Sequence, residues 1–400
     1  MGKMLPGKRL RSVTLCAQIA TSKENMKEVT MNKVFVAIPC WRDPFVYETI
    51  KSAYEQAYDK KRIVFGVFFQ GYPEDDWMID TLQEKLPEVT IHIKKVHGDD
   101  APDYLCQIKR TITDTFLIDE KYYMQVDSHT KFRKNWDIML ETELLIANRT
   151  FGKSVINSQT IYFDHWTDPL ISDPLTSYAD NGEWAGIAGM LSFPYPISLN
   201  GKVVQKPENT MILEKFYNGN MVFADTEYLK EAPFPWEMAQ CFEQQISMLR
   251  AWTAGYNVVS PIHMYTNNFN YWRPDDAGVD EFVRHIRWDR PEQKDRILAA
   301  NLESYEKYKS IFENPENTYN PEYGAFTART IKEYIDFIKY DPVTLQIKEA
   351  VEVDIANAAH ISNELFGNTL MEIAGNAGYD IKNPMDIMID PHSEKRQYHV

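Results

Sequence analysis

The chain of 400 residues contains only four cysteines, and these lie far apart. They are Cys16, Cys40, Cys106 and Cys241, so no C-x-x-C pair is present. A zinc site built from paired cysteines and a disulfide framework are therefore both unexpected. Reduced thiols of this kind are typical of a cytoplasmic protein, and that is the location we predict.

The sequence also lacks a long apolar run. No segment approaches the roughly 18 consecutive apolar residues that a membrane span requires, so no membrane partner is predicted. Residues 2–11 are basic and the next segment is weakly apolar, but that segment is short and is broken by Gln18. This does not have the form of a secretory signal. We predict that residues 1–32 form an N-terminal arm.

Basic residues are fewer than acidic ones, 43 against 58, which leaves a formal net charge of −15. This balance argues against a broad nucleic-acid-binding face, which usually requires a basic stripe, although it allows a local basic cleft. No G-x-G-x-x-G motif follows the first predicted strand and no P-loop lysine appears. Both absences argue against a dehydrogenase or an ATPase.

The apolar fraction of 44% is sufficient for a sizeable core. Apolar or alternating runs predict strands at 34–38, where Pro39 would close the strand, and at 62–70, 89–96 and 122–126. Helical patterns lie between these runs, and the last such helix spans 103–117. Strands that alternate with helices indicate an α/β fold with a mainly parallel sheet, an architecture that often binds nucleotides.

The second half of the chain is less regular. Residues 164–210 are rich in Pro, Gly, Asp and aromatic residues with little periodicity, which indicates a functional substrate loop or lid; the alternative is a disordered segment. A glycine within the predicted strand 216–224 indicates a bulge or the close approach of a ligand. Helical periodicity returns near 291–313, 328–339 and 344–374.

The most informative motif is Asp127-Ser128-His129, which directly follows the predicted strand 122–126. Ligands of open α/β sheets bind at the carboxyl ends of the strands. Asp127 and His129 are two residues apart in extended chain, so they point to one side and could hold a divalent cation. The alternative is a turn followed by a surface histidine.

Other residues permit two interpretations each. Arg42 and Arg110 would suit a diphosphate or a base, or would pair with acids on helix surfaces. Trp41 would pack on a base or in the core, and Asp43 would bind a nucleoside or cap a helix. Glu243, near a helix start, would orient a hydroxyl group or be a solvated acid.

Several segments together resemble glycosyltransferase family 60, the polypeptide N-acetylglucosaminyltransferases that act on hydroxyproline, serine or threonine. The similarity covers about residues 33–345 and is carried by residues 36–44, Gln70, Arg110, residues 122–129, Phe132, and residues 136–137, 242–247, 260–263, 323–324 and 329–334. It implies a GT-A fold, a nucleotide-sugar donor and a metal site of the D-x-H type. It also implies retention of configuration at the sugar.

The resemblance assigns roles to particular residues. The implied metal ligands, for Mn²⁺ or Mg²⁺, are Asp127, His129 and His263; His263 would otherwise be a hydrogen-bonded histidine at a strand end. Implied donor contacts are Pro39, Trp41, Arg42, Asp43, Gln70, Arg110, Asp127 and Ser128. Glu243 and Gln244 are the implied catalytic residues, and Trp136 and Trp184 are assigned to the acceptor.

This sequence departs from the family pattern in three places. The family's Glu-Glu pair is Gln244-Gln245 here, and Asn135 stands in place of a glycine. The region 164–210, where an acceptor would bind, matches poorly. On this basis we predict an N-terminal arm (1–32), a GT-A catalytic domain (33–290), a helical end (291–345) and a C-terminal helical appendage (346–400).

The predicted function is metal-dependent transfer of a sugar, N-acetylglucosamine, from a UDP-sugar to a hydroxyl group on a protein. One alternative acceptor is a hydroxymethylated DNA base, for which Lys131, Arg133 and Lys134 would form a basic patch. A second alternative is a non-catalytic module that binds nucleotide-sugar, which Gln244-Gln245 would favour. A metal-dependent hydrolase is a third, although no second cluster of Asp and His is evident.

Overall fold

The computed structural model describes residues 31–158, 160–163, 166–167, 170–171, 175–178, 202–205, 208–215, 217–269, 291–313, 326–341, 346–347, 358–389 and 393–394. Residues 1–30 of the predicted arm, most of the predicted loop 164–210, and Trp184 lie outside the described residues. In the part that is described, no helix has the length and apolar character needed to cross a bilayer.

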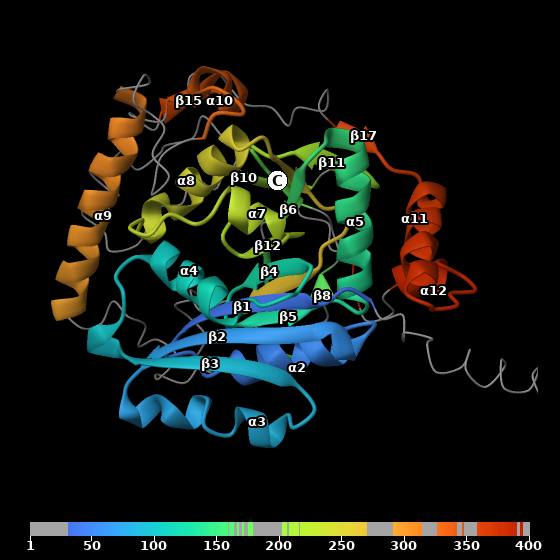
Figure 1. Cartoon of the computed structure of the whole chain (residues 1–400), viewed down its shortest axis with the longest axis horizontal. Coiled ribbons are helices and arrows are strands. Elements are labelled where there is room, and N and C mark those ends of the chain that lie inside the picture. Colours follow the sequence, from blue (N-terminus) through green and yellow to red (C-terminus); the bar gives the residue numbers. More distant parts are fainter. Residues whose placement is uncertain are drawn as a thin grey trace, which may run out of the picture.

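A nine-stranded sheet forms the centre of the protein (Figure 1). In spatial order its strands are β17 (Ala358–His360), β11 (Thr210–Leu213), β13 (Asn257–Ser260), β6 (Ser154–Ser158), β12 (Met221–Asp225), β4 (Tyr122–Val126), β1 (Val34–Trp41), β2 (Ile63–Gly71) and β3 (Thr90–His97). Only β11 and β12 are antiparallel to their neighbours, and the other neighbouring pairs are parallel. The predicted α/β fold with a mainly parallel sheet is confirmed.

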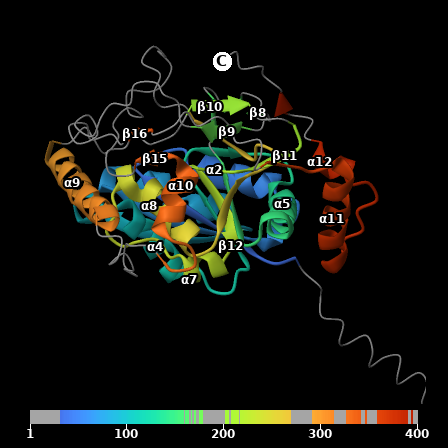
Figure 2. The ribbon, with the colours of Figure 1, turned by 90° about the horizontal axis from the view of Figure 1, so that it is seen from above.

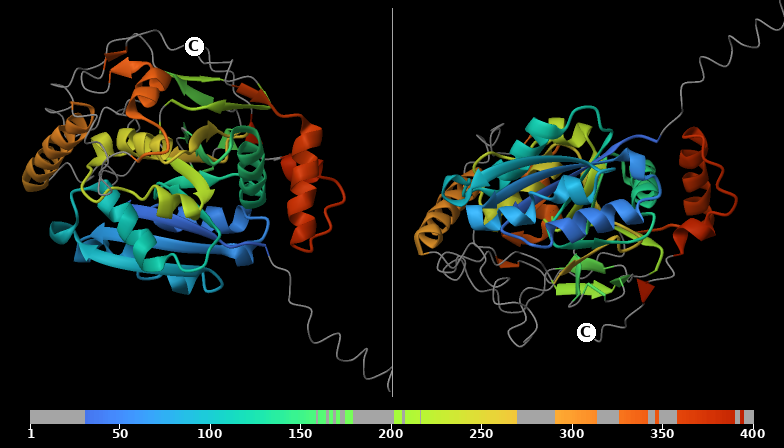
Figure 3. Two further views of the ribbon diagram at one scale, coloured as in Figure 1. Left: turned by 45° about the horizontal axis from the view of Figure 1, so that its top comes forward. Right: turned by 90° about the horizontal axis from the view of Figure 1, so that it is seen from below.

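Helices cover both faces of this sheet, as a parallel sheet requires. They are α2 (Val46–Gln56), α3 (Leu82–Lys85), α4 (Leu105–Phe116), α5 (Trp136–Phe151), α7 (Glu227–Glu231), α8 (Gln240–Thr253), α9 (Pro291–Glu313), α10 (Ile331–Ile338), α11 (Asn363–Asn376) and α12 (Met385–Met388), with the 3-10 turns η1 (Lys60–Arg62), η2 (Pro73–Met78) and η3 (Gly98–Asp100). Figures 2 and 3 show α9 and the α11–α12 pair on opposite sides of the molecule.

The short strands lie outside the central sheet. A three-stranded sheet joins β5 (Thr130–Phe132), β14 (Thr266–Phe269) and β7 (Ile161–Phe163). Three further pairs combine β9 (Leu175–Tyr178) with β10 (Lys202–Gln205), β15 (Tyr340–Asp341) with β16 (Gln346–Ile347), and β8 (Leu170–Ile171) with β18 (Ser393–Glu394). The β5–β14 pairing brings the chain back beside the D-x-H segment.

The side chains of β1 alternate between two cores, because successive residues of a strand point to opposite faces. Val34, Val36 and Ile38 enter the core beneath α2, α5 and α11, whereas Phe35 and Ala37 enter the core beneath α4, α8 and α10. Nearly all of β1 and β2 is buried, which explains their continuous apolar sequences.

Pro39 does not close β1 as predicted, because the strand continues to Trp41. The pairing of β1 with β2 extends over the whole strand, whereas its pairing with β4 ends at Ala37. A proline without an N–H group is tolerated in a strand where one side is unpaired. The first strand therefore reaches further toward the carboxyl edge of the sheet than the sequence indicated.

The C-terminal segment is part of the central fold and differs from the appendage that we predicted. β17 pairs with β11 and so adds an edge strand to the sheet, and α11 packs against α5. Among the described residues of the predicted helical region 344–374, β16 and β17 are strands and α11 is the helix. Buried side chains of this segment in the core under α5 are Ile361, Phe366, Leu370, Ile373, Ala374, Ala377, Ile381 and Met388.

We expect Phe366→Ala to lower the free energy of unfolding by about 3–5 kcal/mol, because the ring is 1% exposed and its loss leaves a cavity. The neighbouring Leu365→Ala is a matched control: Leu365 is 44% exposed, and its removal should change stability by less than about 0.5 kcal/mol. Urea denaturation measures both. Equal stabilities of the two variants would contradict the integration of α11 into the core.

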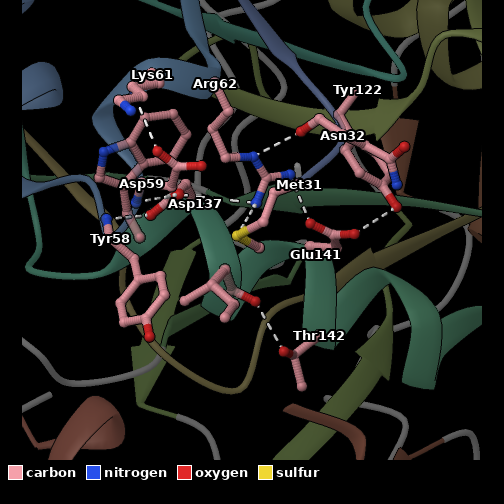
Figure 4. A network of polar contacts seen from close by, with 12 residues as sticks. Met31, Asn32, Tyr58, Asp59, Lys61, Arg62, Tyr122, Asp137, Glu141 and Thr142 are labelled. Atoms are coloured by element: carbon pink, nitrogen blue, oxygen red, sulfur yellow. Dashed lines mark hydrogen bonds and ion pairs between the residues drawn. The ribbon is translucent and has the colours of Figure 1, made fainter. Parts of the chain in front are cut away.

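A buried arginine connects the amino ends of the strands to α5 (Figure 4). Arg62, 2% exposed, donates to the carbonyl oxygen of Asn32 at 2.6 Å and to Glu141 Oε2 at 2.5 Å. The hydroxyl of Tyr122 donates to Glu141 Oε1 at 2.9 Å. Burial raises the pKa of Asp137, and the opposing effect of the nearby Arg62 charge is smaller, so the pKa stays above its usual value. This network secures the end of the sheet opposite to Asp127.

Candidate functional site

The loops after β1 and β4 meet at the carboxyl edge of the sheet, since the two strands are parallel neighbours. Asp43, 6% exposed, belongs to the loop after β1 and contacts the loop after β4. Its Oδ2 accepts a hydrogen bond from Ser128 Oγ at 2.6 Å and lies 2.8 Å from His129 Nδ1. Its Oδ1 accepts a hydrogen bond from the backbone N–H of Phe45 at 2.9 Å. Asp43, Ser128 and His129 therefore form one cluster.

The imidazole of His129 is oriented by this carboxylate. Because an ionised carboxylate only accepts hydrogen bonds, Nδ1 carries the hydrogen in the contact with Asp43. Burial lowers the pKa of His129, but the hydrogen bond to Asp43 and the charges of Asp43 and Asp127 outweigh burial and raise it. Two negative charges beside the ring create an environment that favours a cation.

Asp127 itself is held by two amides. Its Oδ2 accepts hydrogen bonds from Asn220 Nδ2 at 2.7 Å and from Asn268 Nδ2 at 2.6 Å. Asn220 directly precedes β12, and Asn268 lies in β14. Neither asparagine was predicted from the sequence, because both reach Asp127 through pairing between distant segments.

Arg42 follows β1 with a φ of 47°, a conformation that a non-glycine side chain rarely adopts. Its guanidinium binds the buried Asp75 through Nε at 2.7 Å and Nη2 at 3.0 Å. The same group lies 5.1 Å from the ring centre of Tyr72. This geometry favours the interpretation of Arg42 as an ion-pair residue at the rim of the site.

The other residues predicted to bind the donor at this rim are Pro39, Trp41 and Gln70. Gln70, at the end of β2, is 2% exposed, and its Oε1 has no hydrogen-bond partner among the described residues. A buried acceptor without a partner costs stability, so a hydrogen-bond donor from a ligand would be favourable there. Trp41 packs edge-on against Tyr72, with ring centres 6.4 Å apart, and Pro39 is half-buried.

Glu243, in the first turn of α8, is not a solvated acid but is 1% exposed. Its Oε1 forms an ion pair with Lys109 of α4, which is 2% exposed. Its Oε2 has no hydrogen-bond partner among the described residues. Lys109 was not predicted, although its spacing from Cys106 and Ile112 places it on the buried face of the helix.

The backbone of Gly219 lies directly against Glu243 and Gln244. A Cβ atom at residue 219 would be 3.3 Å from Gln244 Nε2 and 3.6 Å from Glu243 Oε1, which is tighter than ordinary contact for the amide. Asn220, the next residue, binds Asp127. The segment 219–220 therefore links the two predicted catalytic residues to the D-x-H segment.

Arg110 is not brought to Asp127 or to Asp43. It lies one residue after Lys109 on α4, pairs with Asp114 at 3.4 Å and lies 4.6 Å from the ring centre of Trp236. It lines a pocket of about 270 Å³ beside α7. These contacts favour its interpretation as a surface ion-pair residue.

Trp136, which was assigned to the acceptor, lies elsewhere in the core. Trp136 is fully buried, packs on Phe132 and donates to the carbonyl oxygen of Ala53 at 2.8 Å, so it is a core residue with no surface for an acceptor. Asn135 before it has a φ of 60°, a conformation that asparagine tolerates better than most residues, which explains why it can replace a glycine.

His263 is bound to Glu143 of α5, whose Oε1 lies 2.8 Å from His263 Nδ1. Glu143 also accepts from the backbone N–H of Ile262 at 2.6 Å and from the hydroxyl of Tyr265 at 2.6 Å. The ring of Phe366 on α11 lies 5.3 Å from the imidazole. The segment after β13 is thus anchored to α5 and α11.

A divalent cation requires several oxygen or nitrogen ligands close together. Across the described ranges, no group of three or more His, Cys, Asp or Glu side chains is close enough to hold a metal ion, so the three predicted ligands are not assembled. Asp127 and His129 still supply a hard oxygen and an imidazole that Asp43 orients. This pair fits a site that a diphosphate and water would complete.

The sequence matches the family model described as Glycosyltransferase (GlcNAc) over residues 107–344. The chain belongs to this family. The matched region contains Asp127, His129, Gly219, Glu243 and Asn268, so it includes most of the site described above. No curated protein matches this chain significantly.

Several solved structures show remote similarity to this chain. S. aureus TarS 1-349 in complex with UDP has 12% identity and a TM-score of 0.36, with 77% of this chain and 78% of TarS covered. TarS 1-349 in complex with UDP-GlcNAc has 11% identity and a TM-score of 0.36, covering 86% and 88%. The mannosyltransferase PcManGT from Pyrobaculum calidifontis, in complex with GDP-Man and Mn²⁺, has 12% identity and a TM-score of 0.35, covering 73% and 76%.

Proposed function

We propose that this glycosyltransferase moves N-acetylglucosamine from UDP-N-acetylglucosamine to a hydroxyl group on a protein, with Mn²⁺ or Mg²⁺ held by Asp127 and His129. The observation that carries the proposal is the hydrogen-bonded cluster of Asp43, Ser128 and His129 at the carboxyl edge of the sheet, where Ser128 directly follows Asp127. Ligands of α/β proteins bind at that edge. Membership of a GlcNAc glycosyltransferase family supports the choice of sugar.

A bound divalent cation would offset the negative charge that develops on the departing diphosphate. Asp127 would contribute one carboxylate oxygen and His129 one imidazole nitrogen. Asp43 would not bind the cation itself but would keep the His129 ring in place and its Nδ1 protonated. Carboxylate partners of this kind commonly orient metal-binding histidines.

In the proposed reaction the acceptor oxygen forms a bond to the anomeric carbon, and the bond from that carbon to the diphosphate oxygen breaks. The acceptor proton passes to the departing diphosphate, and configuration at the sugar is retained. Gln244 would contact the sugar beside the backbone of Gly219. Glu243 would position this segment through its ion pair with Lys109.

The alternative DNA acceptor depended on a basic patch after His129. Arg133 is instead 5% exposed and donates to the carbonyl oxygen of Met388. Lys131 donates to the carbonyl oxygen of Trp166 at 2.8 Å. These contacts direct two of the three cationic groups into the protein, so no structural observation favours DNA over protein.

The acceptor class is tested by mass spectrometry of proteins and of digested DNA from cells that produce the enzyme, with Asp127→Ala as the inactive control. The proposal predicts peptides that carry an added N-acetylhexosamine only with the active enzyme. Sugar-modified nucleosides without any modified peptide would contradict the protein acceptor.

A further inference from the structure

Three segments that are distant in sequence meet at the carboxylate of Asp127. In the antiparallel ladder between β12 and β4, Met221 pairs with Val126, so Asn220 stands opposite Asp127. In the ladder between β14 and β5, Asn268 pairs with Thr130. Strand pairing therefore sets the position of Asn268, and Asn220 is placed by the adjoining first pair of the β12–β4 ladder.

The orientation of the Asn268 amide follows from its partners. Asp127 accepts only, so the amide must turn Nδ2 toward it. This leaves Oδ1 toward the hydroxyl of Thr130, 2.9 Å away, whose single hydrogen is shared with the carbonyl oxygen of Asp127 at 2.8 Å. Asn268 and Thr130 are both fully buried. The amide is thus locked in the orientation that donates to the carboxylate.

Asn220 is held through the residues before it. Its backbone N–H donates to Asn218 Oδ1 at 3.1 Å. Asn157 of β6 in turn exchanges two hydrogen bonds with the backbone of Asn218, each 2.7 Å long. The buried strand β6 therefore supports the second donor to Asp127.

The two amides act on one oxygen and carry no charge. Both bind Oδ2, and no described residue forms a hydrogen bond with Oδ1 of Asp127. A lysine or arginine at either position would neutralise the carboxylate, whereas a neutral donor fixes its direction and leaves its charge available to a cation. Oδ2 of Asp127 is therefore occupied by the two amides, and Oδ1 remains available to a cation.

We infer that Asn220 and Asn268 are positioning residues. They hold the carboxylate of Asp127 so that its Oδ1 is available to a divalent cation. This inference rests on the proposed function. The two asparagines act through their hydrogen bonds to Asp127. Outer partners of metal ligands typically contribute about 10- to 100-fold to metal affinity.

Electron paramagnetic resonance titration of the full chain with Mn²⁺, in the presence of UDP, tests the inference. Asn268→Ala and Asn220→Ala are each expected to raise the Mn²⁺ dissociation constant by about 10- to 100-fold. Asn220 is only half-buried, so Asn220→Ala should fold even if Asn268→Ala does not. In that case the Mn²⁺ affinity of Asn220→Ala tests the inference. Thr130→Val should weaken Mn²⁺ binding in the same direction, and Thr130→Ser, which keeps the hydroxyl group, should restore it.

Asn267→Ala is the matched control, because Asn267 is the preceding residue of β14 and directs its amide to the carbonyl oxygen of Thr266. Its Mn²⁺ affinity should equal that of the wild type. Equal affinities of wild type and folded Asn220→Ala or Asn268→Ala, or an equal loss in Asn267→Ala, would overturn the inference alone. A wild-type protein that binds no Mn²⁺ would overturn both the inference and the proposed function.

Discussion

Asp127→Ala is expected to weaken Mn²⁺-dependent binding of UDP by more than about 100-fold, because it removes the proposed direct ligand, and outer partners alone contribute about 10- to 100-fold. The effect follows from the place of Asp127 at the carboxyl edge, where its Oδ2 is held by two amides. Calorimetric titration with UDP, with and without Mn²⁺, measures the loss.

Asp119→Ala provides the matched control for this experiment. Asp119 lies before β4, at the opposite end of the strand, and forms an exposed ion pair with Lys33 at 3.2 Å. Its variant should bind UDP and Mn²⁺ like the wild type. Undiminished metal-dependent affinity in Asp127→Ala would contradict the assignment of the metal ligand.

Lys109→Met should lower the free energy of unfolding by about 3–5 kcal/mol, because it leaves the buried carboxylate of Glu243 without its ionic partner. A double variant that also carries Glu243→Gln removes both charges and should recover most of the lost stability. Its transfer activity should remain low, because the Glu243 carboxylate that positions the segment beside Gly219 is still missing. Urea denaturation and a transfer assay separate the two effects.

The ion pair of Lys121 and Asp225 lies at the surface, so Lys121→Met is the control that shows how much of the effect of Lys109→Met comes from burial. Lys121→Met should cost less than about 1 kcal/mol, as exposed ion pairs contribute little. A Lys109→Met variant as stable as Lys121→Met, or a double variant no more stable than the single one, would show that the buried pair does not have the role described.

The sheet and its carboxyl edge could be predicted because their signals are local. Buried strands such as β1 and β2 are continuous apolar runs, and each ends in polar residues where the ligand edge begins. Asp43, Asp127 and His129 belong to such strand ends. Their meeting follows from the pairing of β1 with β4.

The buried cation of α4, Lys109, was not predicted, whereas the neighbouring Arg110 was named as a donor contact because of the family resemblance. A helix turns about 100° per residue, so these neighbouring side chains point in different directions. The buried positions Cys106, Ile108 and Ile112 place Lys109, not Arg110, on the inner face. The spacing of the apolar residues of α4 was therefore sufficient to predict that Lys109 is buried.

The contacts that could not be predicted from the sequence depend on pairing between strands that are far apart in the chain. Asn268 reaches Asp127 only because β14 returns to pair with β5, and this pairing has no signature in either strand alone. In the same way, β17 becomes an edge strand only beside β11. Short strands whose partners are distant therefore escape an analysis based on local periodicity.

The release of UDP from UDP-N-acetylglucosamine tests the central claim most directly. The purified chain is incubated with this donor and, in parallel, with GDP-mannose, each with Mn²⁺ or with a chelator. The proposed function predicts release of UDP only from UDP-N-acetylglucosamine with Mn²⁺, and none from Asp127→Ala. Equal release with the chelator, or donor binding without hydrolysis or transfer, would contradict a metal-dependent glycosyltransferase.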